Sequence, residues 1–195
     1  IIVDTKKVYR VQNEVLLNIK NILLIDHHVK TKDSIASVTY EYIDQNESSS
    51  AEIIVDLINE LNIYIPSNIA SIMLAGIHID TNGFILKTNK NTHISASLLY
   101  KLGADNKEVQ YLLKQNFKQY KRRQQLIVRT EFYDDIAITS GKNSVYDTTE
   151  LAKACDILLT FNEVNAAYVI GKISEDTIGI SARSLGDVDV EKTMA

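Results

Sequence analysis

The chain has 195 residues, of which 21 are lysine or arginine and 25 are aspartate or glutamate, so its formal net charge is 21 − 25 = −4. Its hydrophobic fraction of 45% and charged fraction of 24% are typical of a globular protein and exclude a disordered one. The acidic balance argues against tight binding to long nucleic acid, because such binding needs many cationic contacts with phosphates.

The first part of the chain alternates short apolar runs with amphipathic segments. The runs Ile1–Val3 and Ile22–Ile25 each end in an aspartate and are typical of buried parallel strands. A capping box formed by Ser49 and Glu52 predicts a helix that continues to Leu61. Proline, glycine and apolar spacing predict three more helices, at residues 66–76, 94–102 and 106–129.

The second part of the chain contains three strand-like runs and one helical segment. Strands are predicted at residues 136–138, 167–173 and 178–182, with a helix at 149–159 between the first two. We place the boundary between the two parts in the helical segment around 119–131. The longest nearly apolar run, at 69–79, is too short to cross a bilayer. The predicted fold class is therefore α/β, with two α/β units joined by a helical linker.

Side chains capable of holding a metal follow the two predicted strands of the first part. Asp4 follows the first strand, and Asp26-His27-His28 follows the second. Ligands of an open parallel sheet bind beyond the carboxyl ends of its strands, so we expect these side chains to converge there. Asp80 comes directly after an apolar helix. Carboxylates and imidazole together suit Mn²⁺ or a similar divalent ion, and the absence of cysteine ligands argues against a structural zinc site.

The Asp-His-His triplet is the most specific of these signals, because the whole chain contains only four histidines. Its alternative interpretation is a pair of exposed loop histidines, with Asp26 capping a helix. Taken alone, Asp4 is equally compatible with a turn at a strand end, and Asp80 with the Asp-Thr-Asn-Gly turn sequence that it opens. The prediction of a metal site therefore depends on all three segments meeting in space.

Five short motifs together resemble the DHH/DHHA1 phosphoesterase family over essentially the whole chain. They are Ile1-Ile2-Val3-Asp4-Thr5, Leu24-Ile25-Asp26-His27-His28, Ser48-Ser49-Ser50-Ala51-Glu52, Ala75-Gly76-Ile77-His78-Ile79-Asp80-Thr81 with Phe84, and Ile178-Gly179-Ile180-Ser181-Ala182-Arg183-Ser184. The serine run, the Gly-Ala-Asp at 103–105 and the last motif are most similar to the branch of bacterial cyclic-di-AMP phosphodiesterases. The resemblance implies a DHH domain at 1–118 with a mostly parallel sheet flanked by helices, a linker helix at 119–130 and a smaller, partial DHHA1 α/β domain at 131–195.

The resemblance also implies a role for each candidate residue. Asp4, His27 and Asp80 would be metal ligands, with Asp4 shared between two Mn²⁺ ions. His28 would face the phosphate of the substrate, and Asp26 would orient the histidines, as carboxylates do for ligating imidazoles. Substrate contacts are implied for three residues of the DHHA1 region: Ser181, Arg183 and Ser184. An arginine suits this task because its planar guanidinium matches phosphate oxygens.

The sequence departs from the family pattern at both ends and at two internal positions. It begins after the histidine and two aspartates of the family's first metal motif, and it stops before a glycine-rich motif of the DHHA1 domain. Lys6 stands where the family usually carries a histidine, and His78 where an apolar residue is usual. We therefore interpret the chain as an excised fragment, and we expect the parent protein to hydrolyse cyclic-di-AMP and the fragment alone to be metal-deficient and inactive.

Two other functions stay open from the sequence. The same residues would suit cleavage of short oligoribonucleotides or of 3′-phosphoadenosine phosphate, and they would also suit a domain that binds a nucleotide without cutting it. The resemblance implies a small nucleotide as substrate, a parent protein with membrane segments and a cytoplasmic position for this part. Self-association is implied by the resemblance alone, because the sequence carries no signature of it.

The remaining reactive residues have structural interpretations. The single cysteine, Cys155, excludes a disulfide framework, indicates a reducing compartment and is predicted to be buried in helix packing. The basic run 121–123 is predicted to be a solvated helix face. Lys6 is either a phosphate contact or a solvated lysine. His78 is either an imidazole that lies near the site by accident or, as we favour, a buried histidine with its hydrogen bonds satisfied.

Overall fold

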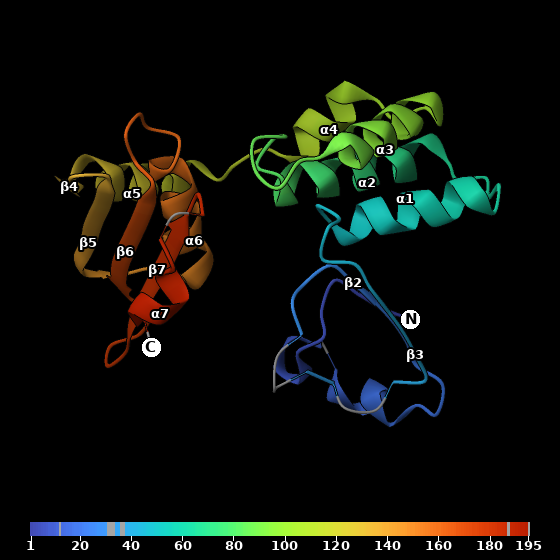
Figure 1. Ribbon diagram of the computed structural model, residues 1–195, viewed down its shortest axis with the longest axis horizontal. Coiled ribbons are helices and arrows are strands. Elements are labelled where there is room, and N and C mark those ends of the chain that lie inside the picture. The colour runs from blue at the N-terminus through green and yellow to red at the C-terminus, as the bar shows by residue number, and fades with distance from the viewer. Residues whose placement is uncertain (12, 31–33, 36–37, 187, 195) are drawn as a thin grey trace. The chain divides into compact units, whose positions relative to one another are not determined.

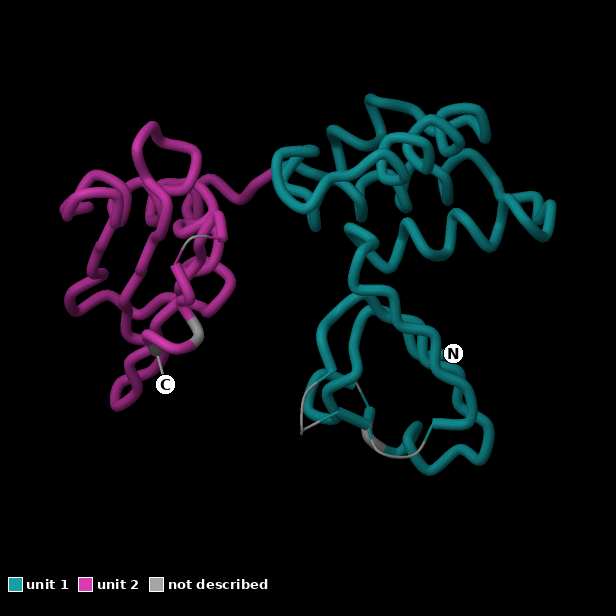
Figure 2. Tube along the Cα trace, in the orientation of Figure 1, with its two compact units in different colours: residues 1–114 teal, residues 115–195 magenta. Residues whose placement is uncertain are grey.

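The computed structural model describes residues 1–11, 13–30, 34–35, 38–186 and 188–194 (Figure 1). The chain forms two compact units, residues 1–114 and 115–195, which Figure 2 distinguishes by colour. Each unit has its own sheet, helices and hydrophobic core, so the predicted α/β fold class is confirmed. No helix in the described residues is both long enough and apolar enough to cross a membrane.

The first unit opens with a parallel sheet of three strands, in the order β1 (Ile2–Val3), β2 (Leu23–Asp26) and β3 (Tyr40–Ile43). Val3 pairs with Ile25, so the residues that follow β1 and β2 lie at the same edge of the sheet. Ile25 is buried as predicted, whereas Val3 is exposed because β1 lies at the side of the sheet. Two short 3₁₀ helices, η1 (Val8–Arg10) and η2 (Glu14–Asn18), separate β1 from β2 in the sequence.

Four helices follow in the first unit: α1 (Ser50–Glu60), α2 (Ser67–Asp80), α3 (Lys90–Lys101) and α4 (Asn106–Leu112). Helix α1 begins at the predicted cap, where Oγ of Ser49 accepts a hydrogen bond of 3.1 Å from the backbone N of Glu52. Helix α2 continues beyond Gly76, because one internal glycine costs only about 1 kcal/mol and Ile77 beyond it is completely buried. This extension makes Asp80 the last residue of α2.

The core of the first unit lies between its helices and fixes the helix ends that reach the sheet. Its buried apolar side chains come from α1, α2, α3 and α4, among them Val55, Ile58, Leu74, Ile77, Leu99 and Val109. The packed core holds the first residues of α1 and the last residues of α2 in place. Both of these helix ends contribute to the cluster of polar side chains described below.

The prediction of one continuous helix over residues 106–129 is wrong. The chain forms α4, then a break, and then α5 (Phe117–Val128) in the second unit. The side chain of Asn116 accepts hydrogen bonds from the backbone N atoms of Lys118 and Gln119, at 2.9 and 3.3 Å. This asparagine therefore caps a new helix, and its capping preference outweighs the helical pattern around it.

The second unit contains α5, a mixed sheet and two further helices. Its strands lie in the order β4 (Glu131–Tyr133), β5 (Ile136–Val145), β6 (Ala166–Lys172) and β7 (Ile178–Ser184), and its helices are α6 (Thr148–Leu158) and α7 (Val190–Met194). Strands β5 and β6 are parallel, and the other neighbours are antiparallel. Helix α6 connects the two parallel strands, as a crossover must, and it begins with a capping box of Asp147 and Glu150.

The basic run of α5 is not a solvated face, so this prediction is also wrong. Arg123 is buried and donates a hydrogen bond to Oε1 of Gln115. Nε of Arg122 lies 2.9 Å from Oε1 of Glu150, and its guanidinium lies over the ring of Tyr146. Arg122 therefore attaches α5 to α6, and of the three residues of the basic run only Lys121 is exposed.

Candidate metal centre

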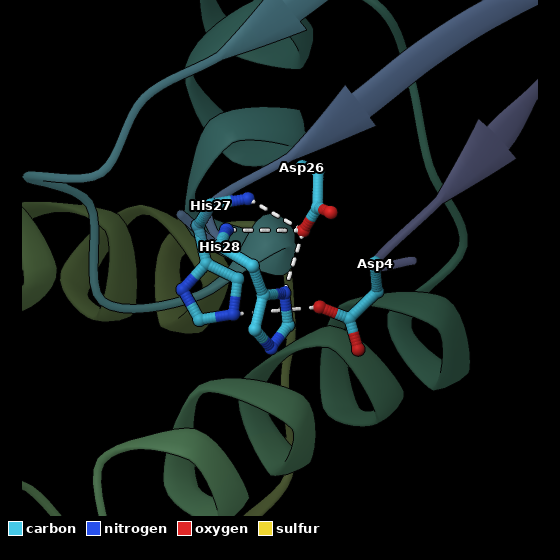
Figure 3. Close-up of side chains that lie close together, drawn as sticks. All are labelled: Asp4, Asp26, His27 and His28. Atoms are coloured by element: carbon cyan, nitrogen blue, oxygen red, sulfur yellow. Dashed lines mark hydrogen bonds and ion pairs between the residues drawn. The ribbon is translucent and has the colours of Figure 1, made fainter. Parts of the chain in front are cut away.

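Four polar side chains meet beyond the carboxyl ends of β1 and β2 (Figure 3). Asp4, Asp26, His27 and His28 each offer one ligand atom, and these four atoms all lie within 4.8 Å of one another. The parallel pairing of β1 with β2 produces this meeting, because the backbone N of Asp4 still donates to the carbonyl of Ile25 at 3.1 Å. Asp4 then adopts a φ of 63°, which turns the chain out of the strand.

The side chain of Asp26 fixes the backbone of the triplet and the ring of His28 through hydrogen bonds. It is completely buried, and its Oδ1 accepts hydrogen bonds from the backbone N atoms of His27 at 2.8 Å and His28 at 3.2 Å. The same oxygen lies 2.7 Å from Nδ1 of His28. A carboxylate oxygen can only accept here, so Nδ1 of His28 carries the proton and its Nε2 is the basic nitrogen. The arrangement suits an orienting carboxylate better than a metal ligand.

One ring nitrogen of His27 has no hydrogen-bond partner in the described residues and lies near two carboxylates. Its Nδ1 lies 3.4 Å from the carbonyl oxygen of Glu47, which accepts the proton of that nitrogen. Its buried Nε2 makes no hydrogen bond to any described residue, yet it lies 3.5 Å from Oδ1 of Asp4 and 3.9 Å from Oδ2 of Asp80. A basic nitrogen among acceptor oxygens is the donor set that a divalent cation satisfies. The residues present therefore fit a metal ion.

The titration behaviour of the three side chains supports the same conclusion. Burial lowers the pKa of His27, but Asp4 and Asp80 outweigh burial, so that its pKa is raised. Burial raises the pKa of Asp80, and the neighbouring charge of Asp4 raises it further. Burial also acts to raise the pKa of Asp4, but the nearby His27 and the hydrogen bond from Ser50 outweigh burial, so that its pKa is lowered. The carboxylates of Asp4 and Asp80 therefore favour positive charge at the position of His27.

Ser50 is a site residue that the sequence analysis did not assign. Its Oγ donates a hydrogen bond of 3.0 Å to Oδ1 of Asp4, from the first turn of α1. The signal was the serine run before Ala-Glu, which the capping box explains only through Ser49. Ser50 therefore orients the carboxylate that the resemblance assigns as the shared metal ligand.

The other predicted site residues lie in the second unit, on β7. Nε of Arg183 lies 3.5 Å from Oδ1 of Asp156, and its Nη1 donates to the carbonyl of Ala182 at 3.0 Å. Oγ of Ser184 donates to the carbonyl of Val188 at 2.7 Å. Ser181 lies on the same strand, and its carbonyl oxygen is 3.1 Å from Sγ of Cys155. Arg183 is half exposed, so its guanidinium remains accessible to a ligand.

Burial decides the three remaining sequence interpretations, which concern Cys155, His78 and Lys6. Cys155 is completely buried in the core of the second unit, which confirms the packing prediction. The prediction of a buried His78 is wrong, because the residue is only partly buried; its ring packs edge-on against Phe84, with ring centroids 4.6 Å apart. Lys6 is neither solvated nor free to meet a phosphate, because it is 2% exposed and donates to the backbone of His28.

Comparison with known proteins identifies the family of the first part of this chain. Residues 1–77 match the DHH family, N-terminal domain. Across its full length the chain is 38% identical to the cyclic-di-AMP phosphodiesterase GdpP of Bacillus subtilis and 36% identical to the cyclic-di-AMP phosphodiesterase PdeA of Listeria monocytogenes, but it spans only 30% of either protein. An exopolyphosphatase-related protein from Bacteroides fragilis shares the fold, with a TM-score of 0.74 and 19% identity over 94% of this chain and 57% of that one. Residues 1–77 are thus a DHH family N-terminal domain, and this is the part of the chain that carries Asp4 and the Asp-His-His triplet.

Proposed function

We propose that this chain is the phosphoesterase part of a metal-dependent enzyme that hydrolyses cyclic-di-AMP. The observation that carries the proposal is the unpartnered Nε2 of His27 between the carboxylates of Asp4 and Asp80. GdpP and PdeA, which match the whole length of the chain, are cyclic-di-AMP phosphodiesterases, and this supports the proposed substrate.

Asp4, His27 and Asp80 would hold Mn²⁺, with Asp4 shared between two ions. When bound, such a pair of ions acidifies a water molecule, polarises the phosphodiester and stabilises the leaving oxygen. The three side chains are fewer than two ions need, so we propose that these 195 residues alone hydrolyse the substrate poorly and that full activity belongs to a longer protein.

His28 and Asp26 would act on the substrate side of this site. The hydrogen bond from Nδ1 of His28 to Asp26 fixes the ring, so that Nε2 of His28, when protonated, can donate a hydrogen bond to a phosphate oxygen. Asp26 keeps that ring and the backbone of the triplet in place through the same oxygen. In the second unit, Arg183 would bind a phosphate of the nucleotide, with Ser181 and Ser184 beside it on β7.

The test is a calorimetric titration with Mn²⁺ of the wild-type chain and of His27→Ala, with His93→Ala as a matched control. His93 stacks on Phe84 and lies outside the cluster. We expect His27→Ala to weaken Mn²⁺ binding by more than about 10-fold, since loss of supporting groups alone costs that much, and His93→Ala to leave binding unchanged. Equal binding by all three proteins would remove His27 from the site.

The substrate is tested separately, by measuring the binding of cyclic-di-AMP to the chain in the presence of Mn²⁺. Competition by short oligoribonucleotides and by 3′-phosphoadenosine phosphate distinguishes the related activities. Binding of cyclic-di-AMP that is unaffected by either competitor supports the proposal. Preferential binding of a competitor would assign the site to cleavage of that competitor. If a longer protein that contains this chain bound cyclic-di-AMP without hydrolysing it, the chain would be a nucleotide-binding domain and not part of an enzyme.

A further inference from the structure

Lys6 is a buried lysine beside the candidate metal centre, and the proposed function does not use it. It is 2% exposed, and no other lysine in the described part of the chain is buried. Lysine is almost never fully buried unless its ammonium group is paired. The position of Lys6 therefore requires a physical explanation.

The contacts of Lys6 connect the segment after β1 with the segment after β2. Its Nζ donates a hydrogen bond to the carbonyl oxygen of His28, and its own carbonyl oxygen accepts a hydrogen bond of 2.6 Å from the backbone N of Ile35. The ammonium group thus holds the end of the Asp-His-His triplet, and the backbone of Lys6 is itself fixed. These two contacts therefore connect two loops that are far apart in the sequence.

The positive charge of Lys6 also compensates the negative charge of the buried Asp26 carboxylate. Oδ1 of Asp26 accepts from the backbone of both histidines and from the ring of His28, whereas the buried Oδ2 has no hydrogen-bond partner in the described residues. A buried carboxylate is costly unless a positive charge or further hydrogen bonds compensate it. Among the acidic side chains, Asp26 has the strongest charge interaction with the Lys6 ammonium.

We propose that Lys6 is a positioning residue, which holds the His28 carbonyl and offsets the buried charge of Asp26 so that the His28 ring keeps one orientation with its proton on Nδ1. The significance of this orientation for hydrolysis rests on the proposed function, but the orientation itself does not. Lys6 acts through Asp26 and His28 and does not touch a metal or a substrate.

The proposal is tested by two-bond ¹H–¹⁵N NMR of the histidine rings in the metal-free chain, at a pH where the imidazoles are neutral. The wild-type chain is expected to show His28 with its proton on Nδ1. Lys6→Met is expected to give an averaged signal from both tautomers, because the hydrogen bond from His28 to Asp26 loosens. Lys6→Arg restores the charge and a donor, and it is expected to restore the single tautomer.

Two controls separate positioning from general stability. Lys20→Met removes an exposed lysine from the same unit and should leave all four rings unchanged. His78 in α2 and His93 in α3 report whether the helical part of each variant is folded. If Lys6→Met lowers the melting temperature but leaves His28 in its single tautomer, Lys6 is only structural and the proposal is overturned.

If Lys6→Met does not fold, Lys6→Gln takes its place, because glutamine can donate to the His28 carbonyl but carries no charge. An averaged His28 signal in this variant supports the proposal, and an unchanged tautomer contradicts it. Failure of the chain to bind Mn²⁺ and cyclic-di-AMP would refute the proposed function without altering any of these ring signals. The two ideas therefore fail independently.

Discussion

Nε2 of His27 lies 3.5 Å from Oδ1 of Asp4, although the two residues follow different strands, β2 and β1. The pairing of Val3 with Ile25 brings the ends of β1 and β2 together, and the hydrogen bond from Nδ1 of His27 to Glu47 turns Nε2 toward the carboxylate. Asp80, at the end of α2, approaches the same nitrogen from another direction. Two carboxylates on one basic nitrogen form a site of net negative charge, and this is what a divalent cation requires.

Ser50 is expected to tune the affinity of this site for a cation. Replacing it with alanine removes the hydrogen bond of 3.0 Å to Oδ1 of Asp4 and leaves that carboxylate free to rotate. We predict that Ser50→Ala weakens Mn²⁺ binding by about 10-fold, as loss of a supporting hydrogen bond does at other metal sites. Calorimetric titration measures this change. Ser97→Ala, at an exposed position of α3, is the matched control and should bind as the wild-type chain does; equal affinities in both variants would show that Ser50 has no part in the site.

The part of this site that follows β1 and β2 was predictable from the sequence, because the two strands run in the same direction. Asp4 and Asp26 each end an apolar run, and parallel strands bring such ends to one edge. Asp80 was not predictable in this way, because its approach to His27 depends on how α2 packs in the helical core. Its assignment rested on the resemblance to a family.

The wrong predictions for the 106–129 helix, the basic run 121–123 and Lys6 have a common physical origin. In each case a side chain forms a hydrogen bond or ion pair that the local sequence pattern does not reveal. Asn116 ends the helical pattern because its side chain caps α5. Arg122 and Arg123 look like solvated charges in the sequence, but Glu150 and Gln115 supply partners that periodicity cannot show. Lys6 is buried for the same reason, since its partner is a backbone carbonyl of a distant loop.

Glu47 is expected to make the stability of the chain depend on pH. Burial raises its pKa from 4.5 to about 7, with the adjacent carboxyl group of Glu52 adding to the shift. The folded chain therefore holds a proton at Glu47 that the unfolded chain releases, and the free energy of unfolding falls as the pH rises from 4.5 to about 7. Glu47→Gln cannot ionise, so this fall should be smaller in the variant.

The measurement is urea unfolding of both proteins in EDTA at several pH values. Glu47→Gln should gain stability relative to the wild-type chain as the pH rises through this interval, and the gain should level off above it. Glu60→Gln, at an exposed position of α1, provides the control and should run parallel to the wild-type chain. A constant difference between Glu47→Gln and the wild-type chain at every pH would contradict the raised pKa.

Arg122 is expected to stabilise the second unit through α5. Its guanidinium pairs with the nearly buried Glu150, donates to the carbonyl of Val145 and covers the ring of Tyr146. Arg122→Ala should lower the free energy of unfolding by about 2 kcal/mol, because Glu150 is left buried without its cation. Lys121→Ala removes an exposed neighbour and should cost less than about 0.5 kcal/mol. Urea unfolding compares the two, and equal losses would show that Arg122 is as dispensable as a surface lysine.

Cys155 should be unreactive in the folded chain. Its side chain is completely buried in the core of the second unit, and burial raises its pKa to about 11. The thiolate is the reactive form, so both access and ionisation oppose attack on an alkylating reagent. Iodoacetamide at mildly alkaline pH should therefore modify the folded chain far more slowly than the chain in concentrated urea, as mass spectrometry would follow with time. Because the chain has a single cysteine, any modification reports on this site alone, and equal rates in the two conditions would mean that the core around α6 opens readily.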